Sequence, residues 1–114
     1  MTTTDTLAVV PSPPPGADAF RGGLAAHYRA PASTYRLQFT PTFTFDHAAR
    51  AVPYLARLGV TDLYFAPVFR AQPGSTHGYD VCDFGQLNPQ LGGDEAFARL
   101  ARELKERGLG VVQD

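Results

Sequence analysis

Four side chains that can bind or react with a ligand lie close together in the sequence. His77, Tyr79, Asp80 and Asp83 supply an imidazole, a phenol and two carboxylates within the run PGSTHGYDVCD, residues 73–83. Aromatic rings offer flat apolar faces to the C–H face of a sugar, and short polar groups bind sugar hydroxyls. Glycines allow the backbone to approach a ligand closely. The run is therefore compatible with a carbohydrate site.

Structural roles for the same residues remain open. Tyr79 can anchor the loop by packing, and Asp80 and Asp83 can cap turns through Asx hydrogen bonds. His77 has no second histidine at ligand spacing, so no metal site is predicted. Cys82 is the single cysteine, and no base or positive charge lies beside it. We therefore expect a small, partly buried side chain rather than a reactive thiol.

The elements that must position this run alternate between strands and helices. Alternation of apolar and polar residues predicts the strands, and apolar residues at the helical period predict the helices. The predicted strands cover residues 34–39, 60–65 and 109–113, and the predicted helices cover residues 44–58 and 94–107. This order is typical of the α/β class with a parallel sheet and right-handed crossovers. Three strands cannot close a barrel, so the chain reads as part of a longer fold.

The helix ends carry their own signals. Thr44 or Asp46 can cap the first helix, with Gly59 ending it, and Asp94 suits the N-cap of the second. Pro53 lies inside the first helical pattern, so we expect a kink or a break there.

The connection over residues 66–93 is long enough to indicate a functional loop rather than a simple turn. Its apolar residues should anchor it, and these are Tyr79, Val81, Phe84 and Leu87. Arg36 and Gln38 share one strand face; they point either to the top of a barrel interior or to solvent, and we favour a structural role. Arg70 could bind a substrate or a carboxylate such as that of Asp83.

Composition excludes several functional classes. The formal net charge is -1, so neither nucleic acid nor an anionic membrane is an expected partner. The single cysteine and the lack of a secretory signal favour a cytoplasmic location. Residues 1–32 are rich in proline and glycine, and we expect a disordered tail followed by a folded domain over residues 33–114.

Several motifs occur together in an order that is similar to a known family. They are TYRLQF, VPYL, LGV, PGSTHGYDV, NP and LGG, within residues 33–114. In order and approximate spacing they resemble the maltooligosyl trehalose synthases of the α-amylase family, glycoside hydrolase family 13. PGSTHGYDV is the most specific of them, whereas LGV and GYD occur widely in that family.

The resemblance implies the first βαβαβ portion of an incomplete (β/α)8 barrel. It implies an enzyme that converts the reducing-end α-1,4 linkage of a maltooligosaccharide into an α,α-1,1 linkage, with no cofactor. Tyr79 would stack on the sugar, His77 and Asp80 would line or support that site, and Asp114 would be a supporting residue. The catalytic carboxylates would lie beyond residue 114, so this fragment would be inactive. A hydrolytic relative and a non-catalytic α/β binding module remain alternatives.

Overall fold

The computed structural model describes residues 29–114, of which residues 31–114 form one compact unit. The tail predicted for residues 1–32 lies outside the described residues, apart from its last few positions. Three parallel strands make the main sheet, in the order β1-β2-β5. Their bounds are Thr34–Leu37, Asp62–Phe65 and Gly110–Gln113. Helix α3, Phe45–Leu58, joins β1 to β2, and helix α4, Gly93–Glu106, leads into β5. The predicted α/β order is therefore confirmed.

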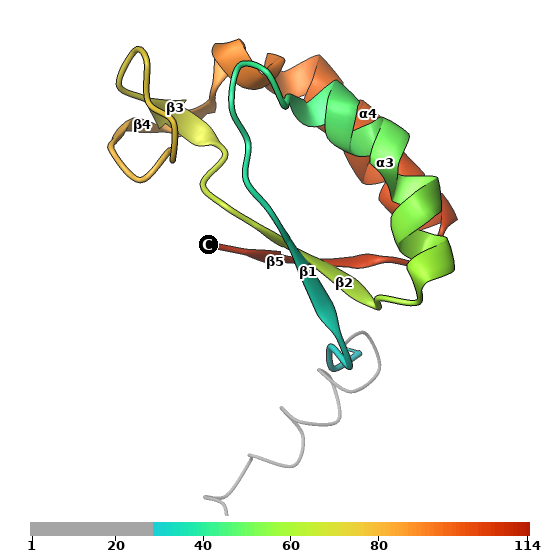
Figure 1. Ribbon diagram of the computed structural model, residues 1–114. Helices are drawn as coiled ribbons and strands as arrows, with labels where there is room; N and C mark the ends of the chain where they lie inside the picture. Colours follow the sequence, from blue (N-terminus) through green and yellow to red (C-terminus); the bar gives the residue numbers. More distant parts are fainter. Residues whose placement is uncertain (1–28) are drawn as a thin grey trace, which may run out of the picture. The chain divides into compact units, whose positions relative to one another are not determined.

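Both helices cover the same face of the sheet (Figure 1). Alternation along β1 and β2 turns Leu37, Leu63 and Phe65 toward the helices, where all three are buried. The Phe39 ring centroid lies 5.1 Å from that of Phe45 in α3 and 5.1 Å from that of Phe65, both in edge-on contact. These rings hold the helix layer against the sheet, and they leave the opposite sheet face for polar residues.

Helix α3 is continuous through Pro53, so the expected break is absent. A proline removes one hydrogen bond inside a helix. Val52 and Leu55, on either side of it, are buried against the core, and this packing holds the helix together. Thr44 is the N-cap, and its amide donates to Nδ1 of His47 over 3.1 Å. Gly59 ends the helix in the left-handed conformation, as predicted.

The N-cap predicted at Asp94 is wrong. A short 3-10 helix, Pro89–Leu91, runs through Gly92 directly into α4, and Gly92 takes the N-cap position with φ 119°. Asp94 lies in the first turn instead, where its negative charge still meets the positive end of the helix dipole.

The long connection contains an antiparallel hairpin that the sequence patterns did not predict. Strand β3, Phe69–Ala71, pairs with β4, Val81–Leu87. Val81 and Leu87 are partly buried, but two of the expected anchors are not: Tyr79 is 54% exposed and Phe84 is 74% exposed. Cys82 is also exposed rather than partly buried. The physical reason is that the hairpin stands apart from the main sheet, so no helix layer covers β4 (Figure 1).

Candidate functional site

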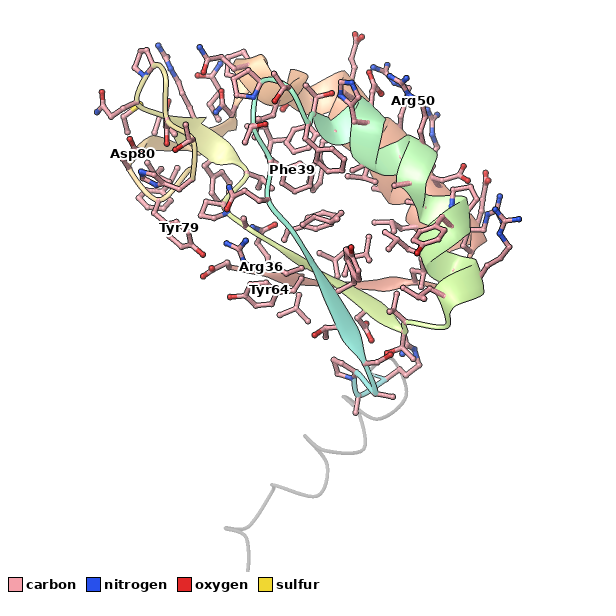
Figure 2. All side chains as sticks on the ribbon, in the orientation of Figure 1. Arg36, Phe39, Arg50, Tyr64, Tyr79 and Asp80 are labelled. Carbon is pink, nitrogen blue, oxygen red and sulfur yellow. The ribbon has the colours of Figure 1, made fainter. Side chains whose placement is uncertain are left out.

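Polar side chains gather on the sheet face that the helices leave open. In the parallel register Arg36 is paired with Tyr64. Leu63 and Phe65, on either side of Tyr64, are buried under the helices, as is Leu37 after Arg36. Asp114 follows β5 directly, and its amide donates to the Phe65 carbonyl over 3.0 Å, so it continues the strand pairing. Arg36, Tyr64 and Tyr79 lie near one another on this face in Figure 2. Strand alternation and parallel pairing thus bring polar residues from β1, β2 and the end of β5 to the same edge of the sheet.

A hydrogen-bonded chain connects the hairpin to this edge. The Tyr79 hydroxyl donates to Oδ2 of Asp114. Nη2 of Arg36 donates to the Tyr79 hydroxyl over 3.2 Å and to Oε1 of Gln38 over 3.1 Å. The structure therefore brings together Tyr79 and Asp114, two of the four residues predicted for the site.

The loop before β4 is held by backbone contacts. Nε2 of Gln38 donates to the His77 carbonyl over 2.9 Å. The Tyr79 amide donates to Nδ1 of His77 over 3.0 Å, and the two rings stack with centroids 6.1 Å apart. Gly78, with φ 80°, sits so close to the Pro67 carbonyl oxygen that an added Cβ would lie 3.0 Å from it. His77 and Gly78 thus set the direction in which the Tyr79 ring points.

Asp80 stands apart from this hydrogen-bonded chain. Its Oδ1 is enclosed and has no hydrogen-bond partner, and it lies 4.0 Å from Nδ1 of His77. Because that nitrogen already accepts the Tyr79 amide proton, it carries no proton of its own to donate to Asp80. Asp80 therefore borders His77 without bonding to it in this arrangement.

The site carries one carboxylate whose charge is stabilised by its neighbours. The hydrogen bond from Tyr79 lowers the pKa of Asp114 most strongly, followed by a hydrogen bond from Tyr64 and the positive charge of Arg36. The same carboxylate raises the pKa of the Tyr64 phenol, because the negative charge favours the protonated donor. Asp114 is consequently an anion at neutral pH, and its Oδ2 already accepts the Tyr79 hydroxyl proton.

A pocket of about 200 Å³ opens beside this network. Its lining residues are Pro67, Phe69, Tyr79, Val81, Phe84 and Asp114. Apolar side chains make most of the wall, and one carboxylate offers a hydrogen-bond acceptor. Pockets that hold drug-sized ligands measure roughly 300–1,000 Å³, so this one has the room for a smaller group such as a single sugar ring.

Arg36, Gln38 and Tyr64 take part in a site that the sequence prediction restricted to four residues. Arg36 and Gln38 both hydrogen-bond to the Tyr79 loop, which is consistent with the structural role favoured for them. Tyr64 was not predicted at all. The sequence feature that could have identified Tyr64 is its position between two apolar residues, Leu63 and Phe65, which are both buried. This alternation is typical of a strand with one polar face.

Asp83 and Arg70, whose roles the sequence leaves open, both make hydrogen bonds within the hairpin. Oδ1 of Asp83 accepts the Gly85 amide proton over 2.8 Å, an Asx hydrogen bond. Nη1 of Arg70 donates to Oε1 of Gln86 over 3.3 Å, within the same hairpin. Across residues 29–114, no three metal-ligating side chains converge, and none of the helices has the length and hydropathy needed to cross a bilayer.

Comparison with known proteins identifies the class that this fold and site define. The family described as "Alpha amylase, catalytic domain" matches residues 47–114. The chain belongs to the α-amylase family.

Within that family, the chain is similar to maltooligosyl trehalose synthases. The crystal structure of maltooligosyltrehalose synthase from Arthrobacter ramosus matches at 52% identity and a TM-score of 0.72, over 74% of this chain and 11% of that one. A candidate maltooligosyl trehalose synthase of Mycobacterium tuberculosis strain H37Rv is 44% identical over 87 residues, 72% of this chain and 11% of its own length. The α/β fragment thus corresponds to part of a barrel enzyme, and the chain spans about a tenth of these relatives.

The similarity extends to other members of the family. Neopullulanase 2 of Thermoactinomyces vulgaris is 46% identical over 63 residues, 55% of this chain and 10% of that protein. The α-amylase of Geobacillus thermoleovorans shares the fold, with a TM-score of 0.66 at 24% identity over 72% of this chain and 22% of that one.

Proposed function

We propose that this chain forms the amino-terminal part of the substrate site of a maltooligosyl trehalose synthase. The observation that carries the proposal is the hydrogen bond from Tyr79 to Asp114 at the carboxyl edge of the parallel strands. This edge is where barrel enzymes place their active sites. The high identity to the Arthrobacter ramosus enzyme supports the choice within the family.

Each residue has a proposed role in holding a glucose unit. The Tyr79 ring, 54% exposed, stacks on the sugar, while its hydroxyl is fixed by Asp114 and Arg36. His77 orients that ring by stacking on it and by accepting its amide proton. Asp80 is proposed to border the site through His77. Asp114 supports the site rather than attacking the sugar, because the Tyr79 hydroxyl already binds its Oδ2 and lowers its pKa, and with it its basicity.

The proposed reaction is an intramolecular transglycosylation with retention. A carboxylate beyond residue 114 attacks the anomeric carbon of the penultimate glucose, and a carboxylic acid gives its proton to the departing O4 of the terminal glucose. The anomeric hydroxyl of that glucose then attacks the glycosyl-enzyme ester and returns a proton to the base. One α-1,4 bond is replaced by one α,α-1,1 bond, no water is consumed, and the reducing end disappears. This chain alone is proposed to be inactive, since those two groups lie outside it.

The test uses the full-length protein that carries this sequence. Incubation with maltopentaose should remove reducing ends without changing the number of sugar units per molecule, measured by a reducing-end assay and mass spectrometry. A Tyr79→Ala variant should lose most of this activity, and Tyr54→Ala serves as the matched control, because Tyr54 is exposed on α3 away from the site. A rise in reducing ends with the wild-type protein would contradict the proposal.

A hydrolytic activity is the second candidate. It is favoured by the similarity to neopullulanase 2 over residues shared with the synthases. In that case water replaces the terminal glucose as the acceptor, and the same incubation produces shorter maltooligosaccharides with more reducing ends.

A further inference from the structure

Phe84 is a large apolar side chain on the hairpin that stands apart from the main sheet. It is 74% exposed, more than any other large hydrophobic residue in the described part of the chain. Single exposed apolar side chains are common on protein surfaces, so exposure alone says little. The position of Phe84 in the hairpin and beside the pocket is more informative.

An irregularity in the hairpin projects Phe84 outward. On β3, Phe69 and Arg70 are consecutive, but their partners on β4 are Leu87 and Asp83. The residues between those partners, Phe84 to Gln86, therefore face no residue on β3 and form a bulge. Bulges disrupt pairing locally, re-aim side chains and are frequent beside active sites.

Two side-chain contacts hold the bulge in shape. The Asp83 carboxylate accepts the Gly85 amide proton over 2.8 Å, and Arg70 donates to Gln86 over 3.3 Å. The Phe69 ring lies behind Phe84, with centroids 5.8 Å apart and planes tilted by 58°. Phe84 is thus a supported ring rather than a freely moving one.

The bulge brings this ring to the pocket that also contains the candidate sugar site. Phe84 and Phe69 line the 200 Å³ pocket together with Tyr79 and Asp114. Two aromatic rings on one pocket wall, with a carboxylate at its side, suit a chain of glucose units, whose C–H faces pack on rings and whose hydroxyls bind carboxylates.

We propose that Phe84 is a specificity-determining residue that packs against the third glucose unit from the reducing end, next to the penultimate unit held by Tyr79. It selects for maltooligosaccharides long enough to reach it. This inference rests on the proposed function of the same site, and it adds a dependence on substrate length that the stacking of Tyr79 does not provide.

The test compares substrate lengths in the full-length protein that carries this sequence. Phe84→Ala should raise KM for maltohexaose by roughly 3- to 10-fold, the range expected for one lost ring contact, while kcat stays near the wild-type value. KM for maltose should change little, since a disaccharide has no third unit to occupy the Phe84 position. Phe84→Tyr, which keeps the ring, should behave like the wild type.

Several outcomes would overturn the proposal. An unchanged KM for maltohexaose would do so, as would an equal rise for both substrates, which would mean that Phe84 only supports the Tyr79 loop. If Phe84→Ala does not fold, Phe84→Leu replaces it in the test, because leucine keeps much of the apolar volume without the flat ring. Wild-type KM values for both substrates in Phe84→Leu would overturn the proposal. A rise in KM for maltohexaose alone would support it.

Failure of the proposed function gives a different signature. Calorimetric titration of the wild type and Phe84→Ala with maltohexaose, in a background where turnover is blocked, reports binding independently of the reaction. The wild-type protein could prove hydrolytic while its Phe84→Ala variant binds maltohexaose roughly 3- to 10-fold more weakly and maltose equally well. That result would contradict the synthase function while supporting the role of Phe84.

Discussion

At the scale of single residues, the site is organised around the Asp114 carboxylate. Tyr79 donates to it, and Tyr64 and Arg36 lie close enough to lower its pKa further. Arg36 also binds the Tyr79 hydroxyl, so the same phenol accepts from a cation and donates to an anion. This arrangement holds the Tyr79 ring through its hydroxyl, and 54% of the side chain stays exposed for a ligand.

Removing the Tyr79 hydroxyl should change the titration of Asp114. In Tyr79→Phe the pKa of Asp114 should rise toward its ordinary value, because the largest cause of its lowering is lost. Tyr64→Phe is the matched control and should give a smaller rise. The measurement is a pH titration of the carboxyl carbon by NMR with labelled aspartate. An equal or larger rise in Tyr64→Phe would show that Tyr79 is not the main partner.

At the scale of elements, the two helices are joined by an ion pair on their outer surface. Arg99 in α4 donates through Nε and Nη2 to the two carboxylate oxygens of Asp46 in α3, over 3.0 Å each. These bonds lower the pKa of Asp46, with Arg99 as the first cause. Because both side chains are partly exposed, water and salt screen the pair.

The stability from this pair should depend on pH in a defined direction. The folded pKa of Asp46 lies below its unfolded value, so the pair stabilises the fold above the unfolded pKa, and the effect is lost as pH falls through the folded pKa. Asp46→Asn should lower the melting temperature slightly at pH 7 in low salt and leave it unchanged at pH 2 or in 1 M salt. An equal loss at every pH would instead indicate a packing defect.

The junction between the 3-10 helix and α4 depends on a glycine. Gly92 has φ 119°, and a Cβ added there would lie 2.6 Å from Cβ of Ala96. Gly92→Ala should therefore lose more stability than Gly59→Ala, which has φ 94° and no atom within 4 Å of the added carbon. The control should lose roughly 1–2 kcal/mol from backbone strain alone, as measured by urea unfolding. Equal losses at the two positions would show that the Ala96 contact costs nothing.

At the scale of the whole molecule, the helices cover the middle of one sheet face but leave a pocket on that face beside β5. A second pocket, of about 220 Å³, lies between α4 and β5 and is lined mostly by apolar residues. They are Phe65, Phe97, Leu100, Ala101, Leu104, Lys105, Leu109 and Val111. Val111 is 44% exposed there. Apolar surface of this kind is normally covered in a stable fold.

Expressed alone, the 114-residue chain should self-associate and melt without a sharp transition, because this pocket and the edge of β5 remain uncovered. Light scattering during gel filtration and a thermal scan provide the measurement. Val111→Lys should reduce the association, whereas Arg57→Lys on α3 should not. A monomer with a sharp two-state melt would favour a self-contained α/β module over a portion of a barrel.

Much of the fold followed from local patterns, because periodicity and capping act over a few residues. The alternation before Pro41 and the helical stripe that includes Val52 and Leu55 predict the strand and helix that the structure contains. The motif PGSTHGYDV indicated the family that the comparisons confirm. Asp94 and Phe84 show the limit of local reasoning, since the first was displaced as N-cap by Gly92 and the second is exposed on a bulge.

The sequence by itself determined the order of the elements, and the tertiary structure decided which polar residues meet. Tyr79 is 43 residues from Arg36 and 35 residues from Asp114 along the chain. No local pattern records that proximity, because it arises when parallel crossovers align the carboxyl ends of separate strands. The same holds for Tyr64, which joins the site through its register with Arg36. Register and crossover geometry are properties of the packed sheet, so they become definite only when the strands are paired.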